Sequence, residues 1–214
     1  MARSRGKSSS SQRWRARQAR DGYARRAREQ GLRSRAVFKL EQINHRHRLL
    51  RPGMTVLDLG AAPGGWSRAA RQIVGDSGRV LAVDILPMEA LAGVEFIRGD
   101  IADAEVRSAL DARLGGAQID ALICDMAPNL SGVRTLDQAR ADALLELTRQ
   151  TAGRHLRPGG SLLVKLFIGP GWEHQLAALR DEFASVHLFK PEASRAASRE
   201  TYAVCLGMGS EPAG

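Results

Sequence analysis

The segment from Thr55 to Arg68, with the sequence TVLDLGAAPGGWSR, constrains the fold more than any other part of the chain. It begins with a short apolar run that includes β-branched residues and stops at a glycine-dense turn, which is typical of a buried strand. Gly60, Gly64 and Gly65 remove side chains where a backbone turns sharply or approaches a ligand, and residues 65–74 have the composition of a helix. A strand, a glycine loop and a helix in this order form the ligand-binding corner of a doubly wound α/β sheet.

The spacing of these glycines differs from that of two common phosphate-binding loops. A nicotinamide site requires G-x-G-x-x-G and a P-loop requires G-x-x-x-x-G-K-[ST], whereas the pattern here is G-x-x-x-G-G with no lysine at the P-loop position. Asp58 precedes the loop, where a carboxylate would repel a pyrophosphate but suits a cationic ligand such as S-adenosylmethionine. The same carboxylate could instead only accept hydrogen bonds from loop amides, and this corner alone leaves both interpretations open.

The length of 214 residues is sufficient for one α/β domain with a substantial core. We expect this domain to span residues 34–209, followed by a loose tail at 210–214. Cys124 and Cys205 lie in apolar runs and are expected to be buried, reduced thiols, and the sequence contains no cysteine and histidine cluster typical of a metal site. Without an apolar stretch of spanning length or a secretory signal, a cytoplasmic protein that does not bind membranes is expected.

The positive charge of the chain is concentrated at one end. The formal net charge is +9, and the first 35 residues hold eleven arginines and one lysine against only two acids. Residues 1–33 also contain Trp14 and Tyr23, so we expect a flexible segment that contacts RNA phosphates and stacks on bases. A solvated tail without function and a mitochondrial presequence are the alternatives.

The rest of the chain alternates between strand and helix patterns, which predicts a doubly wound sheet. Apolar periodicity and the positions of glycine and proline predict strands at 55–59, 79–84, 94–98, 119–125, 161–167, 185–190 and 202–208. The same signals predict helices at 34–48, 65–74, 104–114, 137–155 and 172–183, with Ser34 as the N-cap of the first.

Four of the expected strands end in a carboxylate or are followed by one, at Asp58, Asp84, Asp100 and Asp125. Ligands of doubly wound sheets bind outside the carboxyl ends of the strands, where these acids would meet. Asp84 is the candidate for holding a nucleoside ribose, since an acid at the end of the second strand accepts hydrogen bonds from its hydroxyls. Single acids in such places often cap the next helix, but four around one edge indicate a ligand site.

Lysine is rare in this chain, which has only Lys7, Lys39, Lys165 and Lys190 among 32 basic residues. Lys165 interrupts an apolar strand that should be buried on both faces, and lysine, unlike arginine, can lose its proton when it is desolvated. It is therefore a candidate base. The alternative is that its amine only extends to solvent at the edge of the sheet.

Several segments together resemble the FtsJ/RrmJ-type ribosomal RNA 2′-O-ribose methyltransferases. The matching segments are GLRSRAVFKL, DLGAAPGGWS, the acid of AVDILPM, the acid of RGD, DMAPNLSG, LVKLF and KPEASRAASRETY. They cover nearly the whole chain from Gly31 to Met208. The resemblance implies a Rossmann-like fold, with a seven-stranded, mostly parallel sheet, an antiparallel last strand and helices on both faces.

The resemblance also implies the roles of particular residues. The family's catalytic Lys-Asp-Lys-Glu set falls on Lys39, Asp125, Lys165 and Glu200, with Lys165 as the proton acceptor. Contacts with S-adenosylmethionine fall on Gly64, Trp66, Asp84, Asp100 and Asp125. The glycine corner adds two further candidates for cofactor binding, Asp58 and Gly60. No metal is required. The N-terminal thirty residues and the turn near Gly171 follow the family pattern only loosely.

The function implied is S-adenosylmethionine-dependent 2′-O-methylation of a uridine ribose in 23S rRNA of the large ribosomal subunit. We expect 23S rRNA to be the binding partner and the protein to be a monomer. One alternative is a related enzyme with the same Lys-Asp-Lys-Glu chemistry acting on tRNA or an mRNA cap. The other is a ribosome assembly factor that binds rRNA without turnover.

Overall fold

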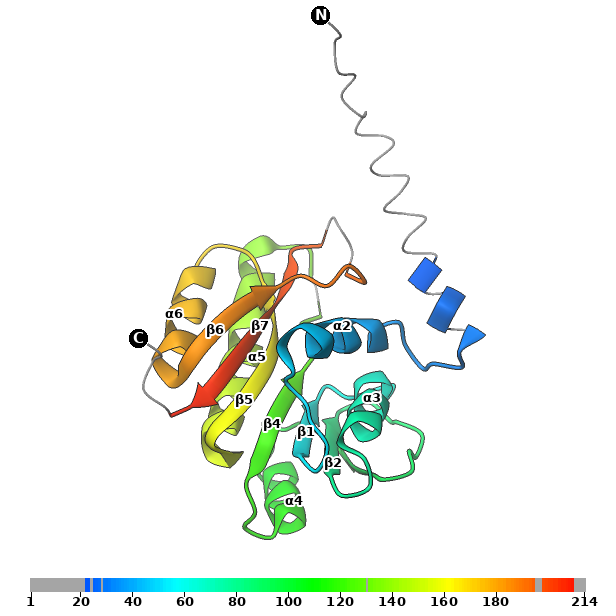
Figure 1. Ribbon diagram of the computed structural model, residues 1–214. Helices are drawn as coiled ribbons and strands as arrows, with labels where there is room; N and C mark the ends of the chain where they lie inside the picture. The colour runs from blue at the N-terminus through cyan, green and yellow to red at the C-terminus, as the bar shows by residue number, and fades with distance from the viewer. Residues whose placement is uncertain (1–21, 24, 28, 130, 195–197, 210–214) are drawn as a thin grey trace, which may run out of the picture.

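The computed structural model describes residues 22–23, 25–27, 29–129, 131–194 and 198–209. The expected tail and the first 21 residues of the basic segment therefore lie outside the described residues. Seven strands form one sheet (Figure 1), in the spatial order β3 (Val94–Arg98), β2 (Arg79–Asp84), β1 (Thr55–Leu59), β4 (Ile119–Cys124), β5 (Leu156–Phe167), β7 (Glu200–Met208) and β6 (Phe183–Phe189).

The last strand along the chain runs against the others. β7 pairs antiparallel with both β5 and β6, whereas the pairs from β3 through β5 are all parallel. This confirms the expected mostly parallel sheet with an antiparallel last strand. Because the order changes direction beside β1, the carboxyl ends of β1 and β4 flank the place where such sheets bind ligands.

Helices cover both faces of the sheet, as expected. One hydrophobic cluster packs α2 (Val37–His47) and α3 (Gly65–Val74) on one face. A second cluster packs α4 (Ala104–Leu114), α5 (Arg134–His155) and α6 (Trp172–Glu182) on the other. Alternate residues of the central strands belong to alternate clusters, as the two-residue period of a strand requires. The core is thus two apolar layers separated by the sheet.

Most expected element bounds agree with the structure, but five starts differ, and those of β6 and β7 come two residues earlier than expected. α2 begins at Val37 after Ala36, so Ser34 is not its N-cap and instead accepts a hydrogen bond from the Ala36 amide at 3.1 Å. α5 begins three residues earlier than expected. β5 begins at Leu156, five residues early, and its pairing with β4 shifts register before Ser161. The exposed Arg157-Pro158-Gly159 stretch, which lies between the expected helix and strand, is an irregular start of that strand.

The described part of the basic segment packs on the domain. Residues 22–23, 25–27 and 29 are helical, and the Tyr23 ring lies 5.4 Å from the Phe38 ring of α2. Ala27 is buried in the same small cluster, and the Arg26 guanidinium lies over the Phe38 ring. Packing against the domain therefore extends to residues before the expected boundary at 34. In the ranges that the structure describes, no helix is long and apolar enough to cross a membrane.

A carboxylic acid lies inside the core of the sheet. Asp58 of β1 is fully buried, and the Ser67 hydroxyl of α3 donates to its Oδ2 at 2.6 Å. Its Oδ1 has no hydrogen-bond partner among the described residues. Burial raises the pKa of Asp58 to about 7, against the lowering effect of the Ser67 bond. The acid therefore joins the first turn of α3 to β1 and is largely protonated below neutral pH.

This pKa makes stability depend on pH in a definite direction. The folded protein keeps the Asp58 proton up to about pH 7, while an unfolded chain releases it near pH 4. The free energy of unfolding therefore falls as the pH rises from about 4 to about 7. The side chain of an Asp58→Asn variant stays neutral at both pH values. The free energy of unfolding of this variant, relative to that of the wild type, should therefore be roughly 2–3 kcal/mol higher at pH 8 than at pH 5.

Urea unfolding of both proteins at the two pH values measures this gain. Asp76→Asn, which changes a fully exposed carboxylate, is the matched control and should show no such trend. A difference between Asp58→Asn and wild type that is the same at both pH values would contradict the assignment.

Candidate active site

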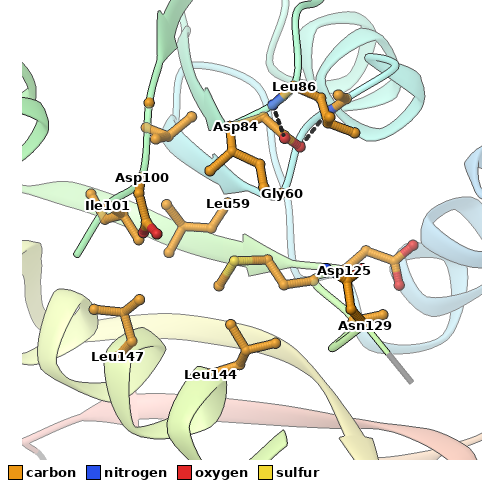
Figure 2. Close-up of a pocket in the computed structure, with 16 residues that line it drawn as sticks. Leu59, Gly60, Asp84, Leu86, Asp100, Ile101, Asp125, Asn129, Leu144 and Leu147 are labelled. Atoms are coloured by element: carbon orange, nitrogen blue, oxygen red, sulfur yellow. Dashed lines mark hydrogen bonds between the residues drawn. The ribbon is translucent and has the colours of Figure 1, made fainter. Parts of the chain in front are cut away.

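A cavity of about 310 Å³ opens at the carboxyl ends of β1, β2, β3 and β4. Figure 2 shows Asp84 and Asp100 on one side of it, with Leu144 and Leu147 of α5 facing them from below. Its other lining residues include Gly60, Ala62, Ile85, Leu86, Ile101, Asp125, Met126 and Asn129. Carboxylates and apolar side chains thus share one pocket, as a ligand with a polar sugar and a flat base would require.

Asp84 joins the two loops that border this cavity. Its Oδ2 accepts a hydrogen bond from the Ala62 amide of the glycine loop, and its Oδ1 accepts one from the Leu86 amide after β2, both at 2.8 Å (Figure 2). Asp100 accepts a bond from the Ala102 amide at 2.9 Å. Both acids therefore organise their own loops, and both also line the cavity.

Two glycines keep the glycine loop close to its neighbours. Gly60 has a φ of +75°, and a Cβ there would lie 2.5 Å from Met126 Cγ. Gly64 has a φ of +99°, and a Cβ there would lie 2.8 Å from Met88 Sδ. Side chains at these positions would strain the backbone and push the loop away from the segments that complete the cavity.

Asp58 and Trp66, both expected to bind the cofactor, have side chains that lie in the core. Neither lines the cavity, and Trp66 is 3% exposed. The Trp66 indole donates to the Ala36 carbonyl at 2.7 Å and lies against the Tyr202 ring. These two side chains hold α3 to β1 and α2. Their direct contact with a ligand stays a prediction.

The four residues of the expected catalytic set lie together, and one of them, Asp125, also lines the cavity. Lys165 Nζ is 2.8 Å from Asp125 Oδ1 and donates to the Asp125 carbonyl at 2.7 Å. Lys39 Nζ lies 3.9 Å from Glu200 Oε2. Figure 2 shows the Asp125 carboxylate pointing away from the cavity that its own backbone borders. The structure thus places this cluster directly beside the pocket.

Strand register explains why these residues meet. Cys124 at the end of β4 pairs with Val164, so Asp125 and Lys165 follow side by side. β7 runs against β5 and places Tyr202 opposite Lys165. Residues two apart in a strand share a face, so Glu200 lies on the same side of β7, toward α2 and Lys39.

Tyr202 is a member of this cluster that sequence reasoning missed. Its hydroxyl donates to Asp125 Oδ1 at 2.6 Å and accepts a bond from Lys39 Nζ at 2.9 Å. The residue is completely buried, and burial followed by the nearby Asp125 charge raises the pKa of Tyr202 far above its usual value. The phenol is therefore a neutral bridge between the two charged groups. The available signal was its spacing of two residues from Glu200 within an apolar strand.

Burial also acts on the first lysine. Lys39 is 7% exposed, and desolvation lowers the pKa of its amine, although the Asp125 carboxylate opposes this shift. Lys165 and Asp125 have side chains that are 5% and 18% exposed. Two buried lysines at one site can stabilise negative charge on a ligand, or one of them can exchange a proton with it. Among the described residues, no group of three or more histidine, cysteine or acidic side chains could hold a metal ion.

The sequence is similar to those of known methyltransferases. The FtsJ-like methyltransferase family matches residues 32–208. A ribosomal RNA large subunit methyltransferase E from Xanthomonas oryzae pv. oryzae is 51% identical over 203 residues, covering 95% of this chain and 96% of that protein. A protein of the same name from Azoarcus sp. is 53% identical over 182 residues, covering 85% and 89%.

A solved structure shares the fold. The crystal structure of a Plasmodium falciparum protein described as a ribosomal RNA methyltransferase superposes with a TM-score of 0.76 at 26% identity, covering 82% of this chain and 98% of that one. The family match includes every element from α2 to β7, and the relatives match over nearly their whole length. The chain belongs to the FtsJ-like methyltransferase family.

Proposed function

We propose that this protein transfers a methyl group from S-adenosylmethionine to the 2′-hydroxyl of a uridine ribose in 23S rRNA of the large ribosomal subunit. The observation that carries the proposal is the Lys165–Asp125–Tyr202–Lys39 cluster, which shares Asp125 with the wall of the cavity. Family membership supports methyl transfer, and the names of the relatives support the large-subunit rRNA as substrate.

The cavity fits S-adenosylmethionine in size and in chemistry. Its volume of about 310 Å³ lies at the lower end of the range typical of small-molecule sites. Asp84 and Asp100 offer acceptors for ribose hydroxyls and for the cationic part, while Ile101, Leu144 and Leu147 offer an apolar surface for a base. When bound, the cofactor supplies a methyl group already activated by a positive sulfur.

The protein must then align a ribose hydroxyl with that methyl group and take up one proton. To act as a base, Lys165 must first release the proton that it carries in the ion pair with Asp125; its neutral amine then has two N–H donors and one lone pair. At Lys165 the two donors would be used by Oδ1 and the carbonyl of Asp125, which leaves the lone pair to accept the hydroxyl proton. Asp125 thus fixes the orientation of the amine, as a base of this kind requires.

The remaining members of the cluster set its charge and shape. Lys39 is held by Tyr202 and by the Glu200 carboxylate, so its amine keeps a fixed place in the cluster, where the substrate hydroxyl would lie beside Lys165. A cation there would stabilise negative charge that develops on the ribose oxygen as its proton leaves. The basic residues before residue 22 would add phosphate contacts with the rRNA.

Replacement of the proposed base tests the mechanism. Lys165→Arg keeps the positive charge but cannot lose a proton, so it should be nearly as inactive as Lys165→Ala. Both should lower the single-turnover rate of methyl transfer to undermethylated large subunits by roughly 10²- to 10⁴-fold. Binding of S-adenosylmethionine should remain nearly intact.

Lys190→Arg is the matched control, because the Lys190 amine donates to the Ser198 carbonyl outside the cluster, and this variant should keep its activity. A folded Lys165→Arg protein that transfers methyl groups at close to the wild-type rate would rule out the role of Lys165 as base.

The bridging hydroxyl gives a second prediction. Tyr202→Phe removes one partner from Lys39 and one from Asp125, and a buried polar group left without its partner costs about 1–3 kcal/mol. The single-turnover rate should therefore fall by roughly 10- to 100-fold while the dissociation constant of S-adenosylmethionine changes less than about twofold.

Tyr23→Phe provides the control, because the Tyr23 hydroxyl accepts a bond from Gln42 away from the cluster. Equal rates for Tyr202→Phe and wild type at saturating S-adenosylmethionine would show that the bridge is dispensable.

A further inference from the structure

Arg33 directs its side chain inward, onto three backbone carbonyls. Its Nη1 donates to the Glu89 carbonyl at 2.8 Å and to the Pro63 carbonyl at 3.2 Å. Its Nη2 donates to the Ala90 carbonyl at 3.2 Å and lies 3.3 Å from the Glu89 carboxylate. The ion pair adds little because the Glu89 side chain is 90% exposed, so the carbonyl bonds account for the placement of Arg33.

The three carbonyls belong to two loops, each of which contributes other residues to the lining of the cavity. Pro63 lies in the glycine loop that begins at Gly60, and Glu89 and Ala90 lie in the irregular segment 85–93 that follows β2. Gly60 and Ala62 line the cavity from the first loop, and Ile85 and Leu86 line it from the second. Ile85 and Leu86 are 61% and 58% exposed, so their side chains do not anchor the segment. The Leu86 amide is bonded to Asp84 at its start, and Arg33 supplies bonds farther along.

We propose that Arg33 is a positioning residue for the cofactor, tying the glycine loop to segment 85–93 so that the two walls keep the spacing a bound ligand needs. The proposal rests on the proposed function in that the cavity takes S-adenosylmethionine. A guanidinium suits this role because its planar fork presents five donors in fixed directions, whereas a lysine amine acts as a single point. Bonds from a charged donor are also stronger than neutral ones.

The geometry separates Arg33 from the arginines that would contact RNA. The Arg33 side chain is 21% exposed, whereas that of Arg25 is 75% exposed. Among the described contacts, Arg25 forms only an ion pair with Glu29. Arg68 supports the same docking, because its guanidinium donates to the Gly31 carbonyl at 3.1 Å. Arg33 therefore supports the loops of the cofactor site from outside the cavity, although it lies in the segment whose charge suggested RNA contact.

The same stretch of chain continues to the catalytic cluster. Three residues after Arg33, the Ala36 carbonyl accepts the bond from the Trp66 indole, and α2 then begins and carries Lys39. A Cβ at Gly64 would lie 3.3 Å from Arg33 Nη1, so the guanidinium is packed against the start of α3 as well. Arg33 thus fixes one end of the segment that leads from the cofactor loops to the first lysine.

Binding and kinetics of Arg33 variants in the full chain test the proposal. Arg33→Gln removes the charged fork, and Arg33→Lys keeps the charge without the fork. Calorimetry with S-adenosylmethionine alone should show a dissociation constant raised about tenfold in Arg33→Gln and by a smaller factor in Arg33→Lys. The KM for S-adenosylmethionine should rise in parallel, while kcat at saturation changes little.

RNA binding and a control variant complete the test. Arg33→Gln should bind rRNA within about twofold of wild type at fixed salt. Arg25→Gln should leave the S-adenosylmethionine affinity unchanged. If Arg33→Gln does not fold, Arg33→Lys alone tests the proposal, through the ratio of its dissociation constant for S-adenosylmethionine to that of the wild type.

An S-adenosylmethionine affinity within twofold of wild type in the Arg33 variants, or a loss confined to RNA affinity, would overturn the proposal. Failure of the proposed function is seen separately, as a wild-type protein that binds S-adenosylmethionine but transfers no methyl group. The effect of Arg33 on binding would still be measurable in that case.

Discussion

The buried contact between Lys165 and Asp125 is the interaction on which the rest of the site depends. Removing two charges from water costs several kcal/mol for each ion, and this cost is offset only if the charges are paired and hydrogen-bonded. Here the 2.8 Å ion pair, the bond to the Asp125 carbonyl and the bond from Tyr202 supply those partners. The parallel pairing of β4 and β5 brings the two residues together, and antiparallel β7 adds the phenol. The sheet topology is therefore a requirement of the site.

Asp125 connects two chemical environments. Its backbone borders the cavity, while its carboxylate faces the lysines on the other side (Figure 2). A methyl donor in the cavity and an acceptor hydroxyl beside the lysines would thus be separated only by Asp125. This arrangement suits a reaction that depends mainly on the alignment of its two substrates. The loops that complete the cavity depend on Asp84 within the site and on Arg33 from outside it.

The fold could be predicted largely from the sequence because its signals are local. β1, α3, β2, β3 and α4 have the expected bounds, since apolar runs and glycines mark their ends. The start of β5 was wrong because pairing with β4 overrides the turn signal of Pro158-Gly159. Tyr202 and Arg33 were missed as site residues for a different reason. Tyr202 lies 163 residues from its partner Lys39 in the sequence, and Arg33 lies 56 residues from its partner Glu89. Sequence periodicity does not predict contacts between residues so far apart.

The most direct measurement is the position of the methyl group in the product. Undermethylated large subunits would be incubated with the purified protein and labelled S-adenosylmethionine, and the rRNA then digested and analysed by mass spectrometry. We expect the label on the ribose 2′-oxygen of a uridine in 23S rRNA, and its loss with Lys165→Arg. Label on a base, or no transfer by folded protein that binds both S-adenosylmethionine and the subunit, would contradict the assignment of this cluster to ribose methylation.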